Sequence, residues 1–315
     1  MNLISWLKGF LNKKKPMDKN ALKISKLFVS YGEKQVIKGI DIIIPKKQII
    51  AIVGLSGSGK STILKASMGL IKSKGCIYIK DKPNYCPQEN AFFDELTVKE
   101  NLDLFASIGS FLKRKDYFSS IKKYLVRLGL IEYLETPVKN LSGGQKKRLN
   151  IIISLLNKPK ILVLDEPFAG LDFYNRKLLW NFFNELKAQG ITIILTTHLL
   201  NEAEDYCNKI FIIKDGKIFS HGTVNHILKS KHIELVLNLK TNYLNKQKLE
   251  ELKQFSQKNK LKLLDVGRTS LMFALTEENE NSLINFLKKQ GVKFQIKERR
   301  TPTLEDLFLT MGDSE

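Results

Sequence analysis

The stretch GLSGSGKST, which runs from Gly54 to Thr62, decides the fold. It follows the apolar run Ile49 to Val53, which indicates a buried strand, and helical periodicity begins at Lys60. A glycine-rich loop between a strand and a helix brings backbone N–H groups close to phosphate oxygens, and the helix N-terminus adds a favourable dipole. The sequence therefore predicts a loop that binds the phosphates of a nucleotide.

The residue types in this loop fit phosphate chemistry. We expect Lys60 to reach the β- and γ-phosphates of ATP and the Ser61 hydroxyl to ligate Mg2+. The other predicted nucleotide-binding positions of the loop are Gly54, Leu55, Ser56, Gly57, Ser58, Gly59 and Thr62.

A second apolar run, Ile161 to Leu164, ends in Asp165 and Glu166. Open α/β sheets bind ligands at the carboxyl ends of their strands. We expect Asp165 to hold Mg2+, and Glu166 to orient and deprotonate the attacking water. The alternative is a solvated acidic pair at a helix start, which Pro167 and the upstream phosphate-binding loop disfavour.

The motif LSGGQ, from Leu141 to Gln145, precedes a predicted helix over residues 146–156. Alone it could be no more than a serine-capped helix start. Together with the phosphate-binding loop and the acidic pair, it makes the chain resemble an ATP-binding cassette (ABC) ATPase over roughly Leu22 to Leu228. The resemblance implies an α/β P-loop nucleotide-binding domain that takes ATP and Mg2+.

Four further positions carry over from the resemblance. Tyr31 resembles the aromatic residue that stacks on adenine, the alternative being a strand aromatic in the core. Gln88 resembles the glutamine that contacts Mg2+ and the γ-phosphate, although a solvated loop glutamine would look the same. Asp172 resembles the loop that crosses to an opposing subunit. His198 resembles the switch histidine that holds Glu166 and the water.

The resemblance also implies a dimer. In this family the signature Ser142, Gly143, Gly144 and Gln145 faces the phosphate-binding loop of a second cassette, so that two ATP molecules lie between two subunits. The chain holds one copy of each motif, which predicts a homodimer or a heterodimer with a similar cassette.

The chain departs from the family pattern in places. The spacing from Lys60 to Gln88 is shorter than usual, which predicts that the peripheral antiparallel sheet is trimmed. Phe168 and Phe173 replace residues that are more often Thr and Pro. Each predicted catalytic residue, Lys60, Gln88, Glu166 and His198, is nevertheless present.

The pattern of apolar and charged residues predicts three parts. These are a basic amphipathic extension over 1–20, an ATPase domain over 21–230 with a helical subdomain at about 89–140, and an accessory or dimerisation domain over 231–315. Residues 231–297 give the order βαββαβ, which suggests a ferredoxin-like domain. Thr303 is the expected N-cap of a closing helix. The extension suits a membrane surface, but a frayed terminus, or a start at Met17, explains it equally.

The composition argues against several classes of protein. No apolar run approaches the roughly 18 residues that a bilayer-spanning helix needs. Three dispersed cysteines without a CxxC pattern argue against a disulfide framework and against a zinc site. The net charge is +20, but only seven of the 52 basic residues are Arg, so specific nucleic-acid binding is not expected.

The resemblance implies an ATP-hydrolysing subunit, peripheral on the cytoplasmic face of the cell membrane, that drives a separate transmembrane permease. The closing segment TPTLEDLFLTMG favours the exporter branch for drugs, lipids or polysaccharides. Phe92 and Phe93 follow Gln88 and either anchor the permease or pack inside the helical subdomain. The rival hypothesis is a soluble cassette ATPase that acts on ribosomes or nucleic acid. A third is that the C-terminal domain senses a ligand.

Overall fold

The structure is a computed structural model that describes residues 19–108, 116–267 and 269–312. It divides into two compact units, described separately below. The first contains Met1–His198 and Tyr206–Phe219, and the second contains Leu199–Asp205 and Ser220–Glu315. The predicted helix of the extension lies outside the described residues. No helix within the described ranges is long and apolar enough to cross a bilayer.

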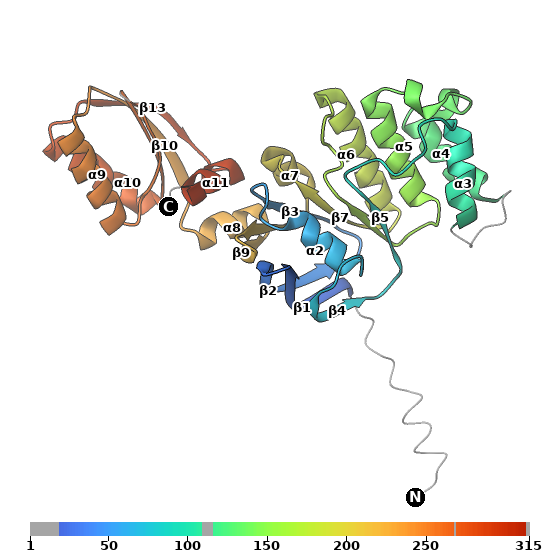
Figure 1. The fold of residues 1–315 in the computed structure, drawn as a ribbon. Coiled ribbons are helices and arrows are strands. Elements are labelled where there is room, and N and C mark those ends of the chain that lie inside the picture. Colours follow the sequence, from blue (N-terminus) through green and yellow to red (C-terminus); the bar gives the residue numbers. More distant parts are fainter. Residues whose placement is uncertain (1–18, 109–115, 268, 313–315) are drawn as a thin grey trace, which may run out of the picture. The chain divides into compact units, whose positions relative to one another are not determined.

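A six-stranded sheet forms the centre of the first unit, in the order β5-β6-β7-β3-β8-β9 (Figure 1). The strands from β5 to β8 pair in parallel, so that their carboxyl ends meet at one edge. Every residue of β3, β6 and β7 is buried, which explains why these strands are continuous apolar runs. The bounds are β3 Ile49–Gly54, β5 Pro83–Cys86, β6 Ile161–Leu164, β7 Thr192–Thr197, β8 Lys209–Lys214 and β9 Lys217–Gly222.

A three-stranded antiparallel sheet lies beside it in the order β2-β1-β4. Its strands are β1 Asn20–Tyr31, β2 Lys34–Pro45 and β4 Lys74–Ile79. One face of β1 and β2 shares a hydrophobic core with α2 (Lys60–Ser67) and with alternate residues of the central strands. The helix that follows the phosphate-binding loop is therefore held between the two sheets.

The helical part of the first unit begins with α3 (Val98–Ile108) and α4 (Asp116–Arg127), which both lie in the stretch predicted to be helical at about 89–140. The short turns η1 (Ile131–Tyr133) and η2 (Val138–Asn140) then lead to α5 (Gly143–Leu155) and, beyond β6, to α6 (Phe173–Ala188). Figure 1 shows α3 to α6 as a group of helices beside the central sheet.

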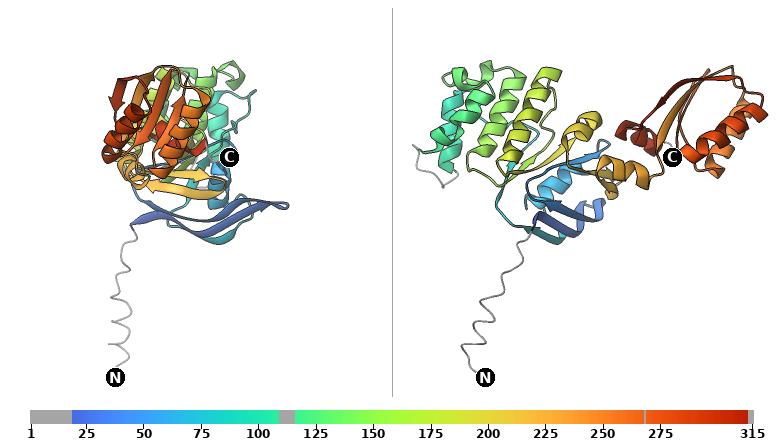
Figure 2. Two further views of the ribbon diagram at one scale, coloured as in Figure 1. Left: turned by 90° about the vertical axis from the view of Figure 1, so that its left-hand side faces the viewer. Right: turned by 180° about the vertical axis from the view of Figure 1, so that it is seen from behind.

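The second unit contains a four-stranded antiparallel sheet in the order β11-β12-β10-β13 (Figure 2). Helices α9 and α10 cover one face, where their leucines pack on alternate residues of β10 and β12 and where Phe255 stacks on Phe286 at 4.1 Å. The bounds are α7 Leu200–Tyr206, α8 Val224–Ser230, β10 Leu235–Thr241, α9 Lys246–Lys258, β11 Lys262–Val266, β12 Ser270–Leu275, α10 Glu277–Lys289, β13 Phe294–Arg300 and α11 Leu304–Gly312. The predicted βαββαβ order is present.

Candidate nucleotide-hydrolysis site

The phosphate-binding loop links the end of β3 to the start of α2, and its glycines are required by space and by backbone conformation. Gly57 and Gly59 have left-handed φ values of 76° and 103°. A Cβ at Gly59 would lie 2.5 Å from Ile37 Cδ1, and one at Gly54 would lie 2.4 Å from the Ile213 carbonyl oxygen. Larger residues would therefore displace the loop, which keeps its backbone N–H groups accessible.

Polar side chains of the loop suit a bound phosphate. The Lys60 ammonium donates to the carbonyl oxygens of Gly54 (3.0 Å) and Leu55 (3.2 Å) and so lies over the loop. The buried Ser58 hydroxyl has no hydrogen-bond partner among the described residues. A buried polar atom of this kind costs about 1–3 kcal/mol unless a ligand or water satisfies it. The loop thus fits a polar ligand such as a phosphate.

Asp165 lies directly after β6 and is 2 % exposed. Its carboxylate accepts hydrogen bonds from the hydroxyls of Ser61 (2.8 Å), Thr196 (2.7 Å) and Tyr85 (3.1 Å). Burial, and then the charge of Asp165, raises the pKa of the Tyr85 phenol, which therefore remains a donor at neutral pH. The Ser61 hydroxyl and the Asp165 carboxylate are thus side by side, as two oxygen ligands of one Mg2+ must be.

Glu166 has a left-handed φ of 46° although it is not glycine, and it is 9 % exposed. Such conformations cost roughly 1–3 kcal/mol and cluster at functional sites. Its N–H donates to Thr196 Oγ1 (2.9 Å), and its Oε2 lies 3.1 Å from His198 Nδ1. A buried carboxylate held in this way is not the solvated acidic pair that the sequence left as an alternative.

A cavity of about 430 Å³ brings the predicted residues together. Tyr31 lies at its wall and is 52 % exposed, so it is not a core aromatic. Gln88 also faces the cavity. The lining residues are Tyr31, Val36, Ser56, Gly57, Gly59, Lys60, Ser61, Thr62, Gln88, Glu166, Ala169 and His198.

Several residues that position these groups do not stand out in the sequence. Besides Thr196 and Tyr85, the buried Lys147 of α5 donates to the Gln88 carbonyl oxygen (3.0 Å). Burial lowers the pKa of Lys147, and the nearby Cys86 and Asp165 oppose that shift. Its neighbour on the helix face, Asn150, donates to the carbonyl oxygen of Pro87 (3.2 Å). The only sequence feature that could have indicated them is the pair of polar residues, Lys147 and Asn150, at core-facing positions of one helix.

The signature motif lies elsewhere. Ser142 caps α5: its hydroxyl accepts from Gln145 N (3.3 Å), and its own N–H donates to Gln145 Oε1 (2.8 Å). Gly143 faces open space, and Gly144 lies against the Asn175 side chain. Asp172 caps α6 by accepting from the N–H of Asn175 (2.8 Å), a hydrogen bond that lowers the pKa of its carboxyl. None of these residues lines the described cavity.

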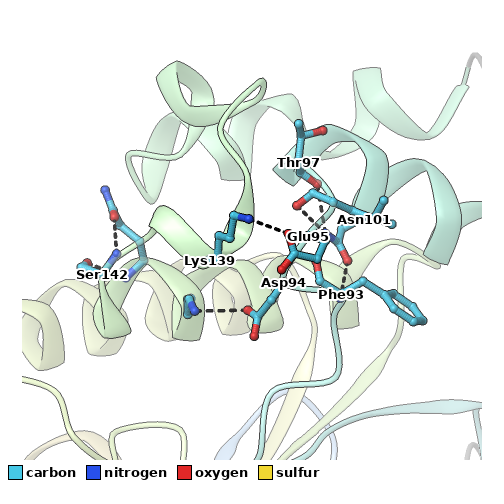
Figure 3. A network of polar contacts seen from close by, with 10 residues as sticks. Phe93, Asp94, Glu95, Thr97, Asn101, Lys139 and Ser142 are labelled. Atoms are coloured by element: carbon cyan, nitrogen blue, oxygen red, sulfur yellow. Dashed lines mark hydrogen bonds and ion pairs between the residues drawn. The ribbon is translucent and has the colours of Figure 1, made fainter.

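The segment after Gln88 is fixed to the helical part of the same unit (Figure 3). Asn101 Nδ2 donates to the carbonyl oxygen of Phe93 (3.0 Å). Asp94 accepts from Lys146 of α5 (3.1 Å), and Glu95 accepts from Lys139 (2.6 Å). The Phe93 ring is nevertheless 56 % exposed, whereas Phe92 is half-buried. A well-anchored backbone thus presents one aromatic ring to solvent.

The two phenylalanines that depart from the family pattern differ in burial. Phe168 is 2 % exposed and stacks on Trp180 with ring centroids 4.4 Å apart, so it belongs to the core. Phe173, the first residue of α6, is 70 % exposed.

A P-loop between a parallel strand and a helix, with a serine–aspartate pair and a buried glutamate at the carboxyl edge, defines a P-loop nucleoside triphosphatase. Comparison with known proteins makes this class specific. The family model described as "ABC transporter" matches residues 37–169. The chain is 33% identical to an uncharacterized ABC transporter ATP-binding protein of Methanocaldococcus jannaschii over 70% of the chain and 84% of that protein. It is 30% identical to the Nod factor export ATP-binding protein I of a Rhizobium species over 95% of the chain and 99% of that protein.

This chain therefore belongs to the ABC transporter ATP-binding proteins, whose cassettes are ATPases. Among solved structures, an ATP-binding subunit of an ABC transporter matches with a TM-score of 0.61 and 29% identity, over 67% of this chain and 92% of that one. An ATP-binding cassette solved in an ADP conformation matches with a TM-score of 0.59 and 27% identity, over 67% and 94%. Other relatives are longer: the chain spans 30% of the ABC transporter G family member 20 of Dictyostelium discoideum, to which it is 35% identical.

Proposed function

We propose that this chain is the ATP-hydrolysing subunit of an ABC exporter and that it drives a separate transmembrane permease. The single observation that carries the catalytic half is the convergence of the Ser61–Asp165 and Glu166–His198 pairs on the phosphate-binding loop. The names of relatives, among them a Nod factor export protein, favour transport over the ribosome or nucleic-acid hypothesis.

The geometry supports a division of labour at the cavity. The Lys60 ammonium turns from the loop carbonyls to the β- and γ-phosphates, and Tyr31 stacks on the adenine ring. Ser61, Asp165 and Gln88 would hold Mg2+, which when bound neutralises charge on the phosphates. Glu166 accepts the proton of the attacking water, and His198 holds the Glu166 carboxylate in position.

The signature residues complete the site of a second copy. Ser142, Gly143 and Gly144, with Gln145 and Asp172 beside them, lie outside the cavity of their own chain, and Gly143 faces open space. In a head-to-tail dimer, the Ser142 hydroxyl and the adjacent backbone N–H groups would stabilise the charge that develops on the γ-phosphate. ATP then closes the dimer, and hydrolysis reopens it.

We assign the permease contact to the surface around Phe93, because its exposed ring stands on a backbone held by Asn101 and by two ion pairs. Contact with a permease would hold the chain at the cytoplasmic membrane face, with the basic extension over 1–20 as a second attachment. The domain boundaries predicted at 20/21 and 230/231 remain part of this proposal. The strand order of the second unit supports a ferredoxin-like accessory domain.

The test uses Glu166→Gln protein, loaded with ATP and Mg2+, as bait in detergent-solubilised membranes of the native host. We expect a polytopic membrane protein to co-purify, and to be lost when Lys60→Ala is added, because the double variant cannot hold the closed ATP-bound dimer. Recovery of ribosomes or nucleic acid without a membrane protein would overturn the transporter assignment. An unchanged rate of ATP hydrolysis in Glu166→Gln would overturn the role of Glu166.

A further inference from the structure

A second and larger cleft, of about 940 Å³, lies in the first unit away from the nucleotide cavity. It is lined by residues at or just before the starts of β3, β6 and β7, such as Lys47, Lys160 and Thr192. The nucleotide cavity lies beyond the opposite ends of these parallel strands. Strands of four to six residues are roughly 13–20 Å long, so the two openings belong to opposite edges of the sheet. We define this cleft as the amino-edge cleft.

The amino-edge cleft concentrates positive charge. Its lining includes six lysines: Lys46, Lys47, Lys80, Lys123, Lys158 and Lys160. The only carboxylate among its described lining residues is that of Asp81. The whole chain has 52 basic to 32 acidic residues, so the lysine-rich composition does not by itself explain a ratio of six to one.

Asp81 cannot balance this charge. It is shared between Lys46 at 3.7 Å and Lys160 at 3.6 Å, both distances being from ammonium nitrogen to carboxylate oxygen. Neighbouring Lys80 lowers the pKa of Lys46, because two cationic side chains repel. A bound anion would relieve this repulsion.

Two of the lysines lie at positions with an unusual backbone conformation. Lys47 and Lys158 have left-handed φ values of 58° and 47°. Gly, Asn and Asp adopt this conformation at the least cost, and lysine has no advantage there. Both side chains are exposed and face the cleft. Both ammonium groups therefore add positive charge to the cleft.

Neutral polar groups complete the wall. Gln189 Oε1 accepts hydrogen bonds from Lys123 (3.0 Å) and from the Tyr124 hydroxyl (3.1 Å), which fixes the α4 side of the cleft. Ser119 and Ser120 add two hydroxyls. The volume lies within the roughly 300–1,000 Å³ of typical small-molecule sites. Lysines act as point charges and suit phosphate groups without imposing a bidentate geometry.

We propose that the amino-edge cleft binds a ligand carrying two or more phosphate charges, as in a soluble polyphosphate or an anionic lipid headgroup. The site is independent of the nucleotide cavity and of the proposed transport function. Its ligand occupies the edge of the sheet where β3, β6 and β7 begin.

The test variant is Lys47→Asn/Lys80→Gln/Lys158→Asn. Asparagine tolerates the left-handed conformation at least as well as lysine, and none of the three residues is paired with Asp81, so folding should be retained. The matched control, Lys65→Gln/Lys177→Gln/Lys217→Gln, removes the same charge from exposed positions outside both cavities. Thermal unfolding shows whether both triple variants are folded. If the cleft variant is not, the single variant Lys80→Glu replaces it.

The first arm measures binding of inorganic tripolyphosphate by calorimetry, with saturating ADP and EDTA so that neither the nucleotide cavity nor Mg2+ contributes. We expect an affinity at least about tenfold weaker in the cleft variant, because three close cationic partners are lost, and little change in the control. The second arm measures sedimentation with phosphatidylcholine vesicles with and without cardiolipin. If the cleft variant binds more weakly than the wild-type protein in the first arm alone, the ligand is a soluble polyphosphate. If it binds more weakly to the cardiolipin vesicles in the second arm, the ligand is a lipid headgroup. No binding in either arm, or equal loss in both variants, would overturn the proposal.

Discussion

The Thr196 hydroxyl connects the two acidic residues of the site. It donates to Asp165 Oδ1 at 2.7 Å, and it accepts the N–H of Glu166 at 2.9 Å. Thr196 is fully buried, so water does not replace either bond when the hydroxyl is lost. One side chain thus holds both the predicted Mg2+ ligand and the predicted base in their relative positions.

Thr196→Val keeps the shape of the side chain and removes both hydrogen bonds. We expect kcat for ATP hydrolysis to fall by about tenfold or more and the free energy of unfolding to fall by about 1–3 kcal/mol, because the Glu166 N–H loses its acceptor. The control is Thr192→Val at the other end of β7, where the hydroxyl accepts the Lys47 N–H (2.9 Å) and no hydrogen bond to Asp165 or Glu166 is present within the described ranges. It should lower stability similarly while kcat stays near the wild-type value. Equal loss of kcat in both variants would contradict a positioning role for Thr196.

Sequence patterns single out the proposed binding and catalytic residues more clearly than the residues that support them. The phosphate-binding loop, Asp165 and Glu166 stand out because their residue types are unusual at the end of apolar strands. Thr196 and Lys147 do not, since a threonine in a strand and a lysine in a helix are ordinary. Only the folded sheet brings Thr196 beside Asp165 across a separation of 31 residues.

Among the elements, α11 depends on one buried charge. Asp306 is 2 % exposed and accepts two hydrogen bonds from the Arg300 guanidinium, at 2.7 and 2.8 Å, and one from the Thr303 N–H at 2.8 Å. Thr303 was the predicted N-cap, and α11 does begin at the next residue. The Thr303 hydroxyl, however, donates to Asp306 at 3.0 Å, so the aspartate holds this helix start through both Thr303 groups.

Asp306→Asn should loosen α11. Burial raises the pKa of this carboxyl, but the hydrogen bonds from Arg300 and Thr303 outweigh burial, so the pKa is lowered overall. The variant leaves Arg300 without its buried partner, and we expect about 3 kcal/mol less protection of the α11 amides in hydrogen exchange at neutral pH. Glu305→Gln is the control, because the Glu305 carboxylate accepts an exposed hydrogen bond from Asn201 at 2.8 Å and none from Arg300 is present among the described residues. It should change protection by less than about 1 kcal/mol.

The same lowered pKa predicts a pH dependence. A carboxyl whose pKa is lower in the folded than in the unfolded chain stabilises the fold above the unfolded value, about 3.9, and loses that contribution as the pH falls through the folded value. Protection of α11 should therefore decline below about pH 4 in the wild-type protein, whereas Asp306→Asn lacks this contribution. Parallel declines in the two proteins would assign the acid sensitivity to other groups.

Helices and strands were predictable where periodicity was strong and where few alternatives existed. The helical stretch predicted at about 89–140 contains α3 and α4, and the βαββαβ order predicted over 231–297 is that of β10 to β13. The strands β4 and β5 were not predicted, because they are short, partly exposed and lack a continuous apolar run. The segment from α7 to α8 was also left without assigned elements, although β8 within it is buried in the central sheet.

At the scale of the whole molecule, one chain carries the two halves of the proposed catalytic site at different places. The phosphate-binding loop and Glu166 line the cavity, whereas Ser142 and Gly143 lie outside it. Two-fold symmetry would bring the signature of each copy to the cavity of the other. The proposed dimer would thus complete both sites, whereas a single chain would leave its own site without a signature motif.

Mixing two inactive variants tests that arrangement. Lys60→Ala disables the phosphate-binding loop and leaves the signature intact. Gly143→Asp places a negative charge where the γ-phosphate of the opposite copy would lie, but folding should hold, because a Cβ at Gly143 meets open space and an acidic residue suits the first turn of α5. Each variant alone should have little ATPase activity.

In an equimolar mixture about half of the dimers contain one copy of each variant, and one of their two sites is then built entirely from wild-type residues. We expect ATPase activity to recover to up to about a quarter of the wild-type value at equal total protein, and to rise with total concentration as dimers form. Double-variant protein carrying both substitutions in one chain, mixed with itself, is the control and should stay inactive. Because recovery requires two chains to share a site, a mixture as inactive as its components would exclude a head-to-tail homodimer and leave a heterodimer with a different cassette as the working unit.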